Sequence, residues 1–155
     1  MGMDVYGKNP KNQSGEYFRN NVWWWRPLAV YVCDIAPNIT KHCENWQTND
    51  GDGLNETRSV KLAEKIKEDL KSGTASVYEQ AYRNRIQAMP DEDCDICAGT
   101  GLRKEAPSTG AGTVPCNGCN GAGQIRPIDA EYPFKLNNVK EFANFLENCG
   151  GFEIW

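Results

Sequence analysis

Two short cysteine motifs constrain the fold of this chain more than any other feature. Residues 94–101 read Cys-Asp-Ile-Cys-Ala-Gly-Thr-Gly and residues 116–123 read Cys-Asn-Gly-Cys-Asn-Gly-Ala-Gly, so both follow the pattern Cys-x-x-Cys-x-Gly-x-Gly. The eighteen residues between the two cysteine pairs are typical of a four-cysteine zinc site. We predict one structural zinc ion bound by Cys94, Cys97, Cys116 and Cys119. A shell of four thiolates has no open position for water or substrate, so we expect no catalytic role for the metal.

The two glycines that end each motif support this interpretation. Glycine adopts positive φ readily and lets backbone N–H groups approach the sulfurs without an intervening side chain. Such N–H groups would share the negative charge of the thiolates. The alternatives are two unrelated turns that contain cysteine and a redox-active dithiol. One motif alone would leave these open, whereas two motifs with the same glycine pattern favour structural zinc.

The repeated motif resembles the cysteine-rich domain of DnaJ-type chaperones, which has four copies and two zinc sites. This chain has two copies within about thirty residues, so the resemblance implies one zinc site on the four cysteines and a hairpin that could bind protein. The His-Pro-Asp motif of the J-domain is missing, and the single histidine, His42, is followed by Cys43. The resemblance therefore does not imply chaperone activity.

A second resemblance covers most of the chain. The segments that carry it are Met-Gly-Met-Asp-Val-Tyr-Gly-Lys-Asn-Pro, Gly-Glu-Tyr-Phe-Arg-Asn-Asn-Val-Trp-Trp-Trp-Arg-Pro-Leu, Asn-Asp-Gly-Asp-Gly-Leu and Gly-Gly-Phe-Glu-Ile. They are similar to those of a group of small uncharacterised bacterial and phage proteins. The resemblance implies a phage or prophage setting in a bacterial cell and no particular biochemical activity.

Length and charge limit the classes of function. At 155 residues we expect one domain, residues 1–155, with a zinc-knuckle insertion at residues 91–127. The 17 basic and 21 acidic residues speak against sequence-independent binding of nucleic acid, which depends on neutralising phosphates. A local basic patch of Arg103, Lys104 and Arg126 keeps a nucleic-acid-binding zinc protein as an alternative.

The chain lacks the usual membrane and export signals. No apolar run approaches the roughly 20 residues of a membrane span, and the N-terminus lacks the basic and apolar regions of a signal peptide. We therefore expect a cytoplasmic protein that does not bind membranes. In a reducing compartment Cys33, Cys43 and Cys149 would stay free thiols.

The hydrophobic periodicity predicts an α+β fold, mostly helical and compact, with an inserted zinc-knuckle hairpin and short terminal strands. Helices are expected over residues 28–36 with Pro27 in the first turn, 38–46, 56–71, 74–89, and from Asn137 or Asn138 onward. Strands are expected over residues 3–6, 124–128 and 152–155. The predicted buried faces of the last three helices are Val60, Ala63, Ile66 and Leu70; Val77, Ala81, Ile86 and Met89, helped by Tyr78 and Tyr82; and Val139, Phe142, Ala143, Leu146 and Cys149.

The tryptophan run provides the first candidate surface. Trp23, Trp24 and Trp25 cannot all face one way on a helix or a strand, so at least one should be partly exposed. Trp, Tyr and Arg are favoured in the energetic centres of interfaces. We predict that Arg19 and the block from Trp23 to Arg26 face a partner, together with the loop of residues 103–115 that begins at Arg103. The alternative is that the tryptophans anchor the core.

Asp50 and Asp52 have the alternate spacing of calcium ligands, but Lys61 stands where a calcium loop has its final glutamate. A hydrogen-bonded turn is the favoured interpretation. A small-ligand site or an enzyme that combines these aspartates with Arg19 or Arg26 and a Trp face remains an alternative. A second metal site from Cys33, His42 and Cys43 lacks an obvious fourth ligand.

These observations together predict a non-enzymatic, zinc-stabilised module that binds another protein, with no catalytic residues. The phage-type resemblance suggests an inhibitor of a host or defence protein. The identity of the partner is left open by the sequence.

Overall fold

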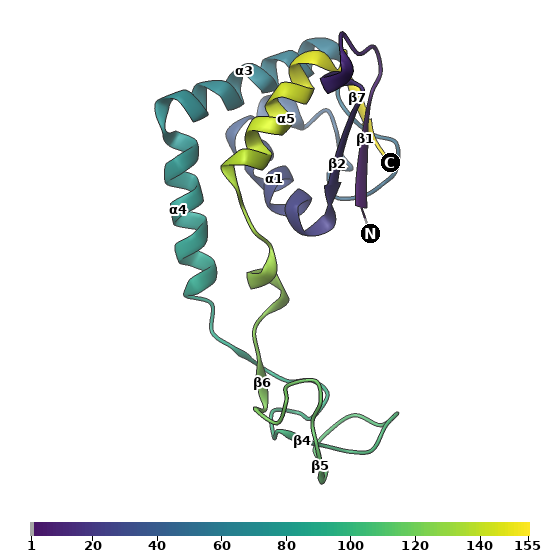
Figure 1. The fold of residues 1–155 in the computed structure, drawn as a ribbon, viewed down its shortest axis with the longest axis vertical. Helices are drawn as coiled ribbons and strands as arrows, with labels where there is room; N and C mark the ends of the chain where they lie inside the picture. Colours follow the sequence, from purple (N-terminus) through teal and green to yellow (C-terminus); the bar gives the residue numbers. More distant parts are fainter. Residues whose placement is uncertain (1) are drawn as a thin grey trace. The chain divides into compact units, whose positions relative to one another are not determined.

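A three-stranded antiparallel sheet joins the two ends of the chain. The structure is a computed structural model that describes residues 2–155. Strand β1 (Gly2–Gly7) lies between β2 (Tyr17–Asn21) and β7 (Phe152–Ile154), and a short 3-10 turn, η1 (Gln13–Gly15), precedes β2 (Figure 1). The terminal strands predicted from the sequence are confirmed, whereas β2 was not predicted because its Tyr-Phe-Arg-Asn-Asn sequence is largely polar.

Helix α5 (Leu136–Asn148) covers the inner face of this sheet. Phe18 of β2 lies with its ring 5.1 Å from that of Phe142 and 5.8 Å from that of Phe145. The predicted buried face of this helix, Val139, Phe142, Ala143, Leu146 and Cys149, is confirmed. The predicted cap is wrong: neither Asn137 nor Asn138 begins the helix, and the first N–H, on Leu136, donates to the Glu79 carboxylate at 3.2 Å.

Helix α1 (Val22–Ile35) begins earlier than the sequence predicted, directly after β2. The side chain of Asn21 accepts a hydrogen bond from the Trp24 N–H at 3.0 Å, which is the usual role of an N-cap residue. The start predicted at residue 28 is therefore wrong, and Pro27 lies inside the helix rather than in its first turn. A proline inside a helix removes one helical hydrogen bond, but here Pro27 is buried.

The segment after α1 holds less helix than predicted. Only α2 (Pro37–Thr40) is helical within the predicted 38–46 range. Residues 41–55 form loops that are anchored by the buried residue Trp46. The Trp46 indole N–H donates to the Thr40 carbonyl at 3.0 Å. The backbone carbonyl of Trp46 accepts from the Trp25 indole N–H at 2.5 Å.

Helix α3 (Glu56–Ser72) lies beside α5 (Figure 1). Asn55 caps it by accepting from the Arg58 N–H, and Gly73 ends it with a φ of 84°, as predicted from the glycine. Its buried residues are Ser59, Leu62, Ala63, Ile66 and Asp69. The predicted face was rotated by about one position, so Val60 and Leu70 are only half-buried.

The burial of Asp69 explains the rotation of that face. Its carboxylate accepts hydrogen bonds from Lys65 Nζ at 2.7 Å and from the Tyr31 hydroxyl at 3.4 Å. A buried carboxylate needs such partners. The periodicity of apolar residues alone did not indicate them.

Helix α4 (Thr74–Gln87) packs through only part of the face predicted for it. Val77 is 70% exposed and Ala81 is also exposed. Tyr78 and Tyr82, the two tyrosines expected to help this face, lie one turn apart and pack against Phe134 with ring separations of 4.9 and 5.7 Å. The larger aromatic rings bury more surface than Val or Ala, so they decide the orientation.

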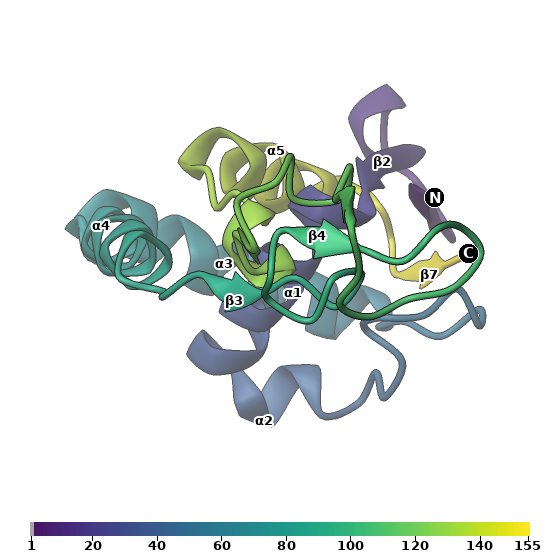
Figure 2. The same ribbon diagram turned by 90° about the horizontal axis from the view of Figure 1, so that it is seen from below.

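The chain divides into two compact units. The first, here called the main unit, runs to Asn84 and resumes at Tyr132–Trp155, and the second, the knuckle unit, is Arg85–Glu131. The knuckle unit contains the short pairs β3 (Glu92–Asp93) with β6 (Gln124–Ile125) and β4 (Leu102–Arg103) with β5 (Val114–Pro115), and the 3-10 turn η2 (Ile128–Glu131); Figure 2 shows β3 and β4.

The predicted α+β architecture, mostly helical with an inserted hairpin and terminal strands, is confirmed. None of the helices between residues 2 and 155 combines the length and apolar character needed to cross a bilayer.

Candidate metal centre

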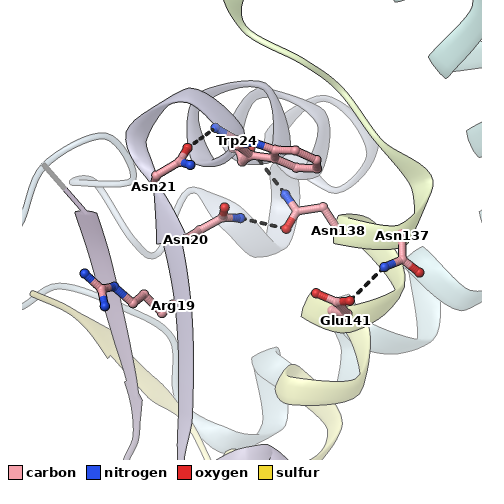
Figure 3. Close-up of a pocket in the computed structure, with 7 residues that line it drawn as sticks. All are labelled: Arg19, Asn20, Asn21, Trp24, Asn137, Asn138 and Glu141. Atoms are coloured by element: carbon pink, nitrogen blue, oxygen red, sulfur yellow. Dashed lines mark hydrogen bonds between the residues drawn. The ribbon is translucent and has the colours of Figure 1, made fainter.

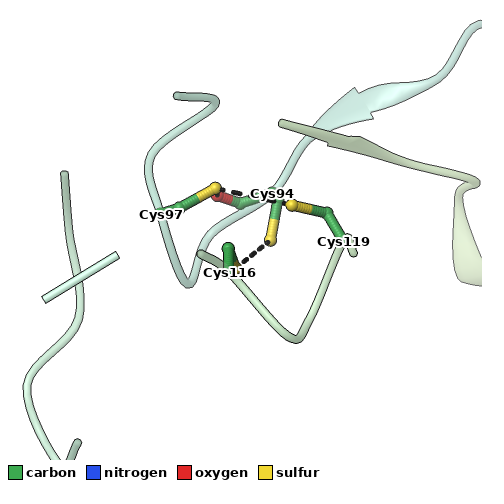
Figure 4. Close-up of side chains that lie close together, drawn as sticks. All are labelled: Cys94, Cys97, Cys116 and Cys119. Atoms are coloured by element: carbon green, nitrogen blue, oxygen red, sulfur yellow. Dashed lines mark hydrogen bonds between the residues drawn. The ribbon is translucent and has the colours of Figure 1, made fainter. Parts of the chain in front are cut away.

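Four cysteine sulfurs lie together in the knuckle unit. All four ligand atoms lie within 4.8 Å of one another, with Cys94 Sγ 3.9 Å from Cys116 Sγ and Cys97 Sγ 3.7 Å from Cys119 Sγ (Figure 4). A disulfide requires about 2.05 Å, and all four are free thiols. Metal–sulfur bonds of about 2.3 Å in a tetrahedron place the sulfurs roughly 3.8 Å apart. The cluster could therefore hold a metal ion.

The two cysteine pairs are held together by matched backbone contacts. The N–H of Cys94 donates to the Gly123 carbonyl at 2.8 Å, and the N–H of Cys116 donates to the Gly101 carbonyl at 2.9 Å. Each first cysteine is thus bonded to the last glycine of the other motif. The repeated sequence folds as two related halves that meet at the sulfur cluster.

The last glycine of each motif also supports its own cysteine. Gly101 N–H points at Cys97 Sγ over 3.3 Å, and Gly123 N–H points at Cys119 Sγ over 3.2 Å. A backbone N–H donated to sulfur stabilises the thiolate. The sequence predicted this role for the glycines.

Backbone donors and burial act in opposite directions on the acidity of the thiols. Burial raises the pKa of Cys94 to about 11. Burial also acts to raise the pKa of Cys116, but the backbone N–H groups of Cys119 and Gly118 outweigh it and lower that pKa to about 7. A cation that binds the cluster must displace protons from at least some of these thiols.

The donor set limits which metals fit. Four thiolates with tetrahedral spacing suit zinc or iron rather than the oxygen-seeking magnesium and calcium. The four cysteines are buried, and Ile96 is the hydrophobic residue packed against them. They fill a tetrahedral shell completely, so the site has no position left for a substrate.

The tryptophan run divides between core and surface. Trp25 is fully buried, with its ring 5.6 Å from Phe142 in an edge-on arrangement. Trp23 is 39% exposed and lies 4.9 Å from the ring of Tyr132. Arg26 lies over the same tyrosine ring at 5.3 Å, a cation–π contact. The exposed part of the run is therefore Trp23 with Arg26, beside Tyr132.

Trp24 lines a separate, open hollow of about 540 Å³ in the main unit (Figure 3). Arg19 borders the same hollow, but its guanidinium is turned away from it, towards Asp4 at 3.8 Å. The remaining lining residues are Asn20, Asn21, Asn137, Asn138 and Glu141. The hollow thus brings together two of the residues predicted from the sequence and none of the predicted aspartates.

The sequence did not identify Asn20 and Asn138 as site residues. Both are buried, and the Asn20 amide donates to Asn138 Oδ1 at 2.8 Å. Asn138 was considered only as a possible cap of the last helix, and Asn20 was not singled out at all.

Asp50 and Asp52 lie in a turn that is bound to β7. Asp52 accepts backbone hydrogen bonds from Glu44 at 2.6 Å, Asn45 at 3.0 Å and Gly53 at 2.7 Å. Burial acts to raise the pKa of Asp52, but these three donors outweigh it and lower the pKa below 3.8. Asp50 accepts from the Thr48 hydroxyl. Both carboxylates serve the turn.

Arg103 holds the base of the loop predicted to face a partner. Its guanidinium donates to Asn117 Oδ1 at 2.6 Å and to the Lys104 carbonyl at 3.0 Å. The loop is tied to the first knuckle, because the Gly110 N–H donates to the Ile96 carbonyl at 2.9 Å. Arg103 is half-buried. Its guanidinium hydrogen bonds are therefore made within the knuckle unit, to Lys104 and Asn117.

The other cysteines do not form a second metal site. Within residues 2–155 the four-cysteine cluster is the one group of His, Cys, Asp and Glu side chains close enough to hold an ion. Cys43 is buried, which raises the pKa of its thiol to about 12, and His42 is exposed. Cys149 lies in the core, as predicted.

In comparisons with known proteins, no family model, curated protein or solved structure matches this chain.

Proposed function

We propose that this chain is a non-enzymatic module that is stabilised by one zinc ion and binds another protein. The observation that carries the proposal is the spacing of the four buried sulfurs, which corresponds to a closed tetrahedral shell. A closed shell supplies stability and shape rather than catalysis.

The knuckle unit has little hydrophobic core of its own. The buried cluster there consists of the four cysteines with Ile96 packed against them, and the paired strands are only two residues long. So small a core supplies little hydrophobic stabilisation. We infer that metal binding supplies much of the folding energy of this unit and holds the hairpin at residues 103–115 in shape.

The exposed aromatic residues of the main unit support a protein partner. Trp23 and Arg26 both contact the ring of Tyr132, and Trp24, which lies between them in the sequence, borders the hollow. Trp and Arg on a rigid helix are the residues that most often dominate binding energy. Trp25 is excluded from this surface because it is buried.

Two alternatives have less support. A small-ligand or enzyme site of Asp50, Asp52 and a Trp face would need these groups to converge, but Asp52 is occupied by three backbone donors. A nucleic-acid site on the knuckle unit would face an unfavourable charge balance, because residues 85–131 contain four basic and seven acidic residues.

We further propose that residues 1–155 act as one domain with residues 91–127 as its zinc-knuckle insertion, and that the protein works in the cytoplasm of a bacterial cell. The setting proposed is that of a phage-type inhibitor of a host or defence protein. It is supported by the sequence resemblance alone.

Two measurements test the proposal. Metal analysis of the purified chain should give about one zinc per chain, with loss of zinc in Cys116→Ser and retention in the control Cys33→Ser, whose cysteine lies outside the cluster. Affinity capture from a bacterial lysate should then recover one protein in stoichiometric amount. A bound metabolite, in place of a protein, would support the small-ligand alternative.

A further inference from the structure

Strand β2 presents an open backbone edge. In residues 2–155, the sheet has β2 at one edge and β7 at the other. Asp4, which lies opposite Arg19 in the register, exchanges both of its backbone hydrogen bonds with Trp155, at 2.9 and 2.7 Å. Arg19 therefore directs its own N–H and C=O away from β1. Because these directions alternate along an antiparallel strand, Tyr17, two residues earlier, also directs its N–H and C=O outward.

This edge lacks the features that protect exposed strands. Proteins block open edges with Pro, Lys, bulges or inward charges. The five residues of β2 include no Pro and no Lys, and they pair with β1 in an unbroken register from Tyr17 to Asn21. Its one charged side chain, on Arg19, is turned across the sheet to Asp4. Another strand can therefore approach the edge.

The polar hollow lies directly beside this edge. Figure 3 shows it between β2 and the first turns of α5, on the side of β2 away from β1. Asn20 donates a hydrogen bond to Asn138, and Asn138 donates to the Trp24 carbonyl at 3.3 Å, so this wall is held by side-chain hydrogen bonds. A strand bound to the edge would place one of its side chains in the hollow.

The chemistry of the hollow indicates which side chain fits. Glu141 is the acidic residue among those that line it, and its carboxylate accepts from the Asn137 amide at 2.8 Å. The Arg19 guanidinium is turned away and paired with Asp4. The interior therefore offers a carboxylate and amide oxygens, which together accept hydrogen bonds from a Lys or Arg side chain.

We propose that an extended segment of a partner protein adds to the β2 edge as a fourth strand and places a basic side chain in the hollow against Glu141. Main-chain hydrogen bonds to Tyr17 and Arg19 supply affinity, and the hollow supplies specificity. This inference rests on the proposed function in that the ligand is a protein.

A second copy of the chain fits the edge less well. Antiparallel pairing of β2 with β2 of another copy, centred on the strand, would place Arg19 opposite Arg19. Like charges directly opposite each other are destabilising. The hollow would also receive no basic group that complements Glu141.

Peptide selection on the full-length, zinc-loaded protein tests the inference. The probe is a displayed library of random twelve-residue peptides. Enriched sequences should combine β-forming residues with Lys or Arg at one fixed position. Binding should fall about tenfold or more in Glu141→Lys, which reverses the charge of the hollow, and also in Arg19→Pro, which removes an outward N–H without removing a bond to β1. The control Glu147→Lys, on the same helix but outside the hollow, should bind as the unaltered protein does.

Hydrogen exchange provides a readout that a folding defect would not imitate. Bound peptide should slow exchange of the Tyr17 and Arg19 N–H groups. Enriched peptides without a basic position would overturn the edge site while leaving protein binding intact. So would binding by Glu141→Lys and Arg19→Pro that is as tight as binding by the unaltered protein. A dimer that buries β2 would also overturn it. Failure both to enrich peptides and to capture a protein would overturn this inference and the proposed function together.

Discussion

Gly101 lies against the backbone of Gly121, in the opposite knuckle. A Cβ at position 101 would come within 2.3 Å of the Gly121 carbonyl oxygen, and a Cβ at Gly123 would come equally close to the carbonyl oxygen of Gly99. Each motif therefore ends in a glycine because the other motif occupies the space of a side chain. The relationship connects the repeat in the sequence to the mutual packing of its two halves around the sulfurs.

This contact predicts that Gly101→Ala destabilises the cluster. Gly101 and Gly121 have similar positive φ values, 77° and 81°, but a Cβ at 121 would meet nothing within 4 Å. Both alanine variants are destabilised by about 1–2 kcal/mol, because alanine adopts a positive φ less readily than glycine. Only Gly101→Ala adds a clash between its Cβ and the backbone of the other motif. Competition with a chelator should show much weaker zinc retention in Gly101→Ala than in Gly121→Ala. Equal retention would mean that the knuckles do not pack as described.

The residue after the second cysteine of each motif offers a stabilising change. Ala98 and Asn120 occupy these equivalent positions, and both have a φ of 51°. Asparagine tolerates this left-handed conformation better than alanine. We predict that Ala98→Asn raises the stability of the zinc-loaded knuckle unit by up to about 1 kcal/mol, measured by chelator-induced unfolding. A decrease would show that the position does not adopt the left-handed conformation.

Trp25 and Trp23 should behave differently although they are two residues apart. Trp25 is fully buried, so Trp25→Ala should cost about 3–5 kcal/mol in denaturant unfolding. Trp23 is partly exposed, so Trp23→Ala should cost much less stability but weaken binding to a captured partner. Similar losses of stability in both variants would assign the whole run to the core.

Parts of this fold follow from sequence, and others do not. The clustering of the four cysteines and the α5 face were predictable because spacing and periodicity are local. The α3 and α4 faces were predicted only in part, because the deciding partners, Tyr31 for Asp69 and Phe134 for Tyr78, come from distant segments.

The start of α1 and the strand β2 were missed for a related reason. Asn21 was not recognised as an N-cap, because Pro27 is a more familiar signal of a helix start. The polar hollow could not be predicted, since it forms where β2 meets a helix more than one hundred residues later in the sequence.

The turn that holds Asp52 should make stability depend on pH. The folded-state pKa of Asp52 is lowered, so its carboxylate contributes stability that is present above the unfolded-state pKa, near 3.8, and is lost as the pH falls through the folded-state pKa. We predict that Asp52→Asn lowers the free energy of unfolding at neutral pH. The difference in this free energy between the variant and the unaltered protein should shrink as the pH falls. Denaturant unfolding at a series of pH values, from neutral to below 3.8, measures this difference.

Asp50→Asn is the matched control for that series. The Asp50 carboxylate accepts from the Thr48 hydroxyl and, in residues 2–155, from no backbone N–H. It should therefore show a smaller loss at neutral pH. If the free energy of unfolding of Asp52→Asn stayed below that of the unaltered protein by a constant amount as the pH fell, the stabilisation would not come from the ionised carboxylate.

The central claim is that four thiolates bind one zinc ion that holds the knuckle unit together. The most direct measurement is native mass spectrometry of the intact chain, before and after removal of metal, with hydrogen exchange over residues 94–123. We predict a mass increase of one zinc per chain, and protection of residues 94–123 that disappears when zinc is removed and returns when it is restored. A metal-free chain that shows the same protection would contradict the account.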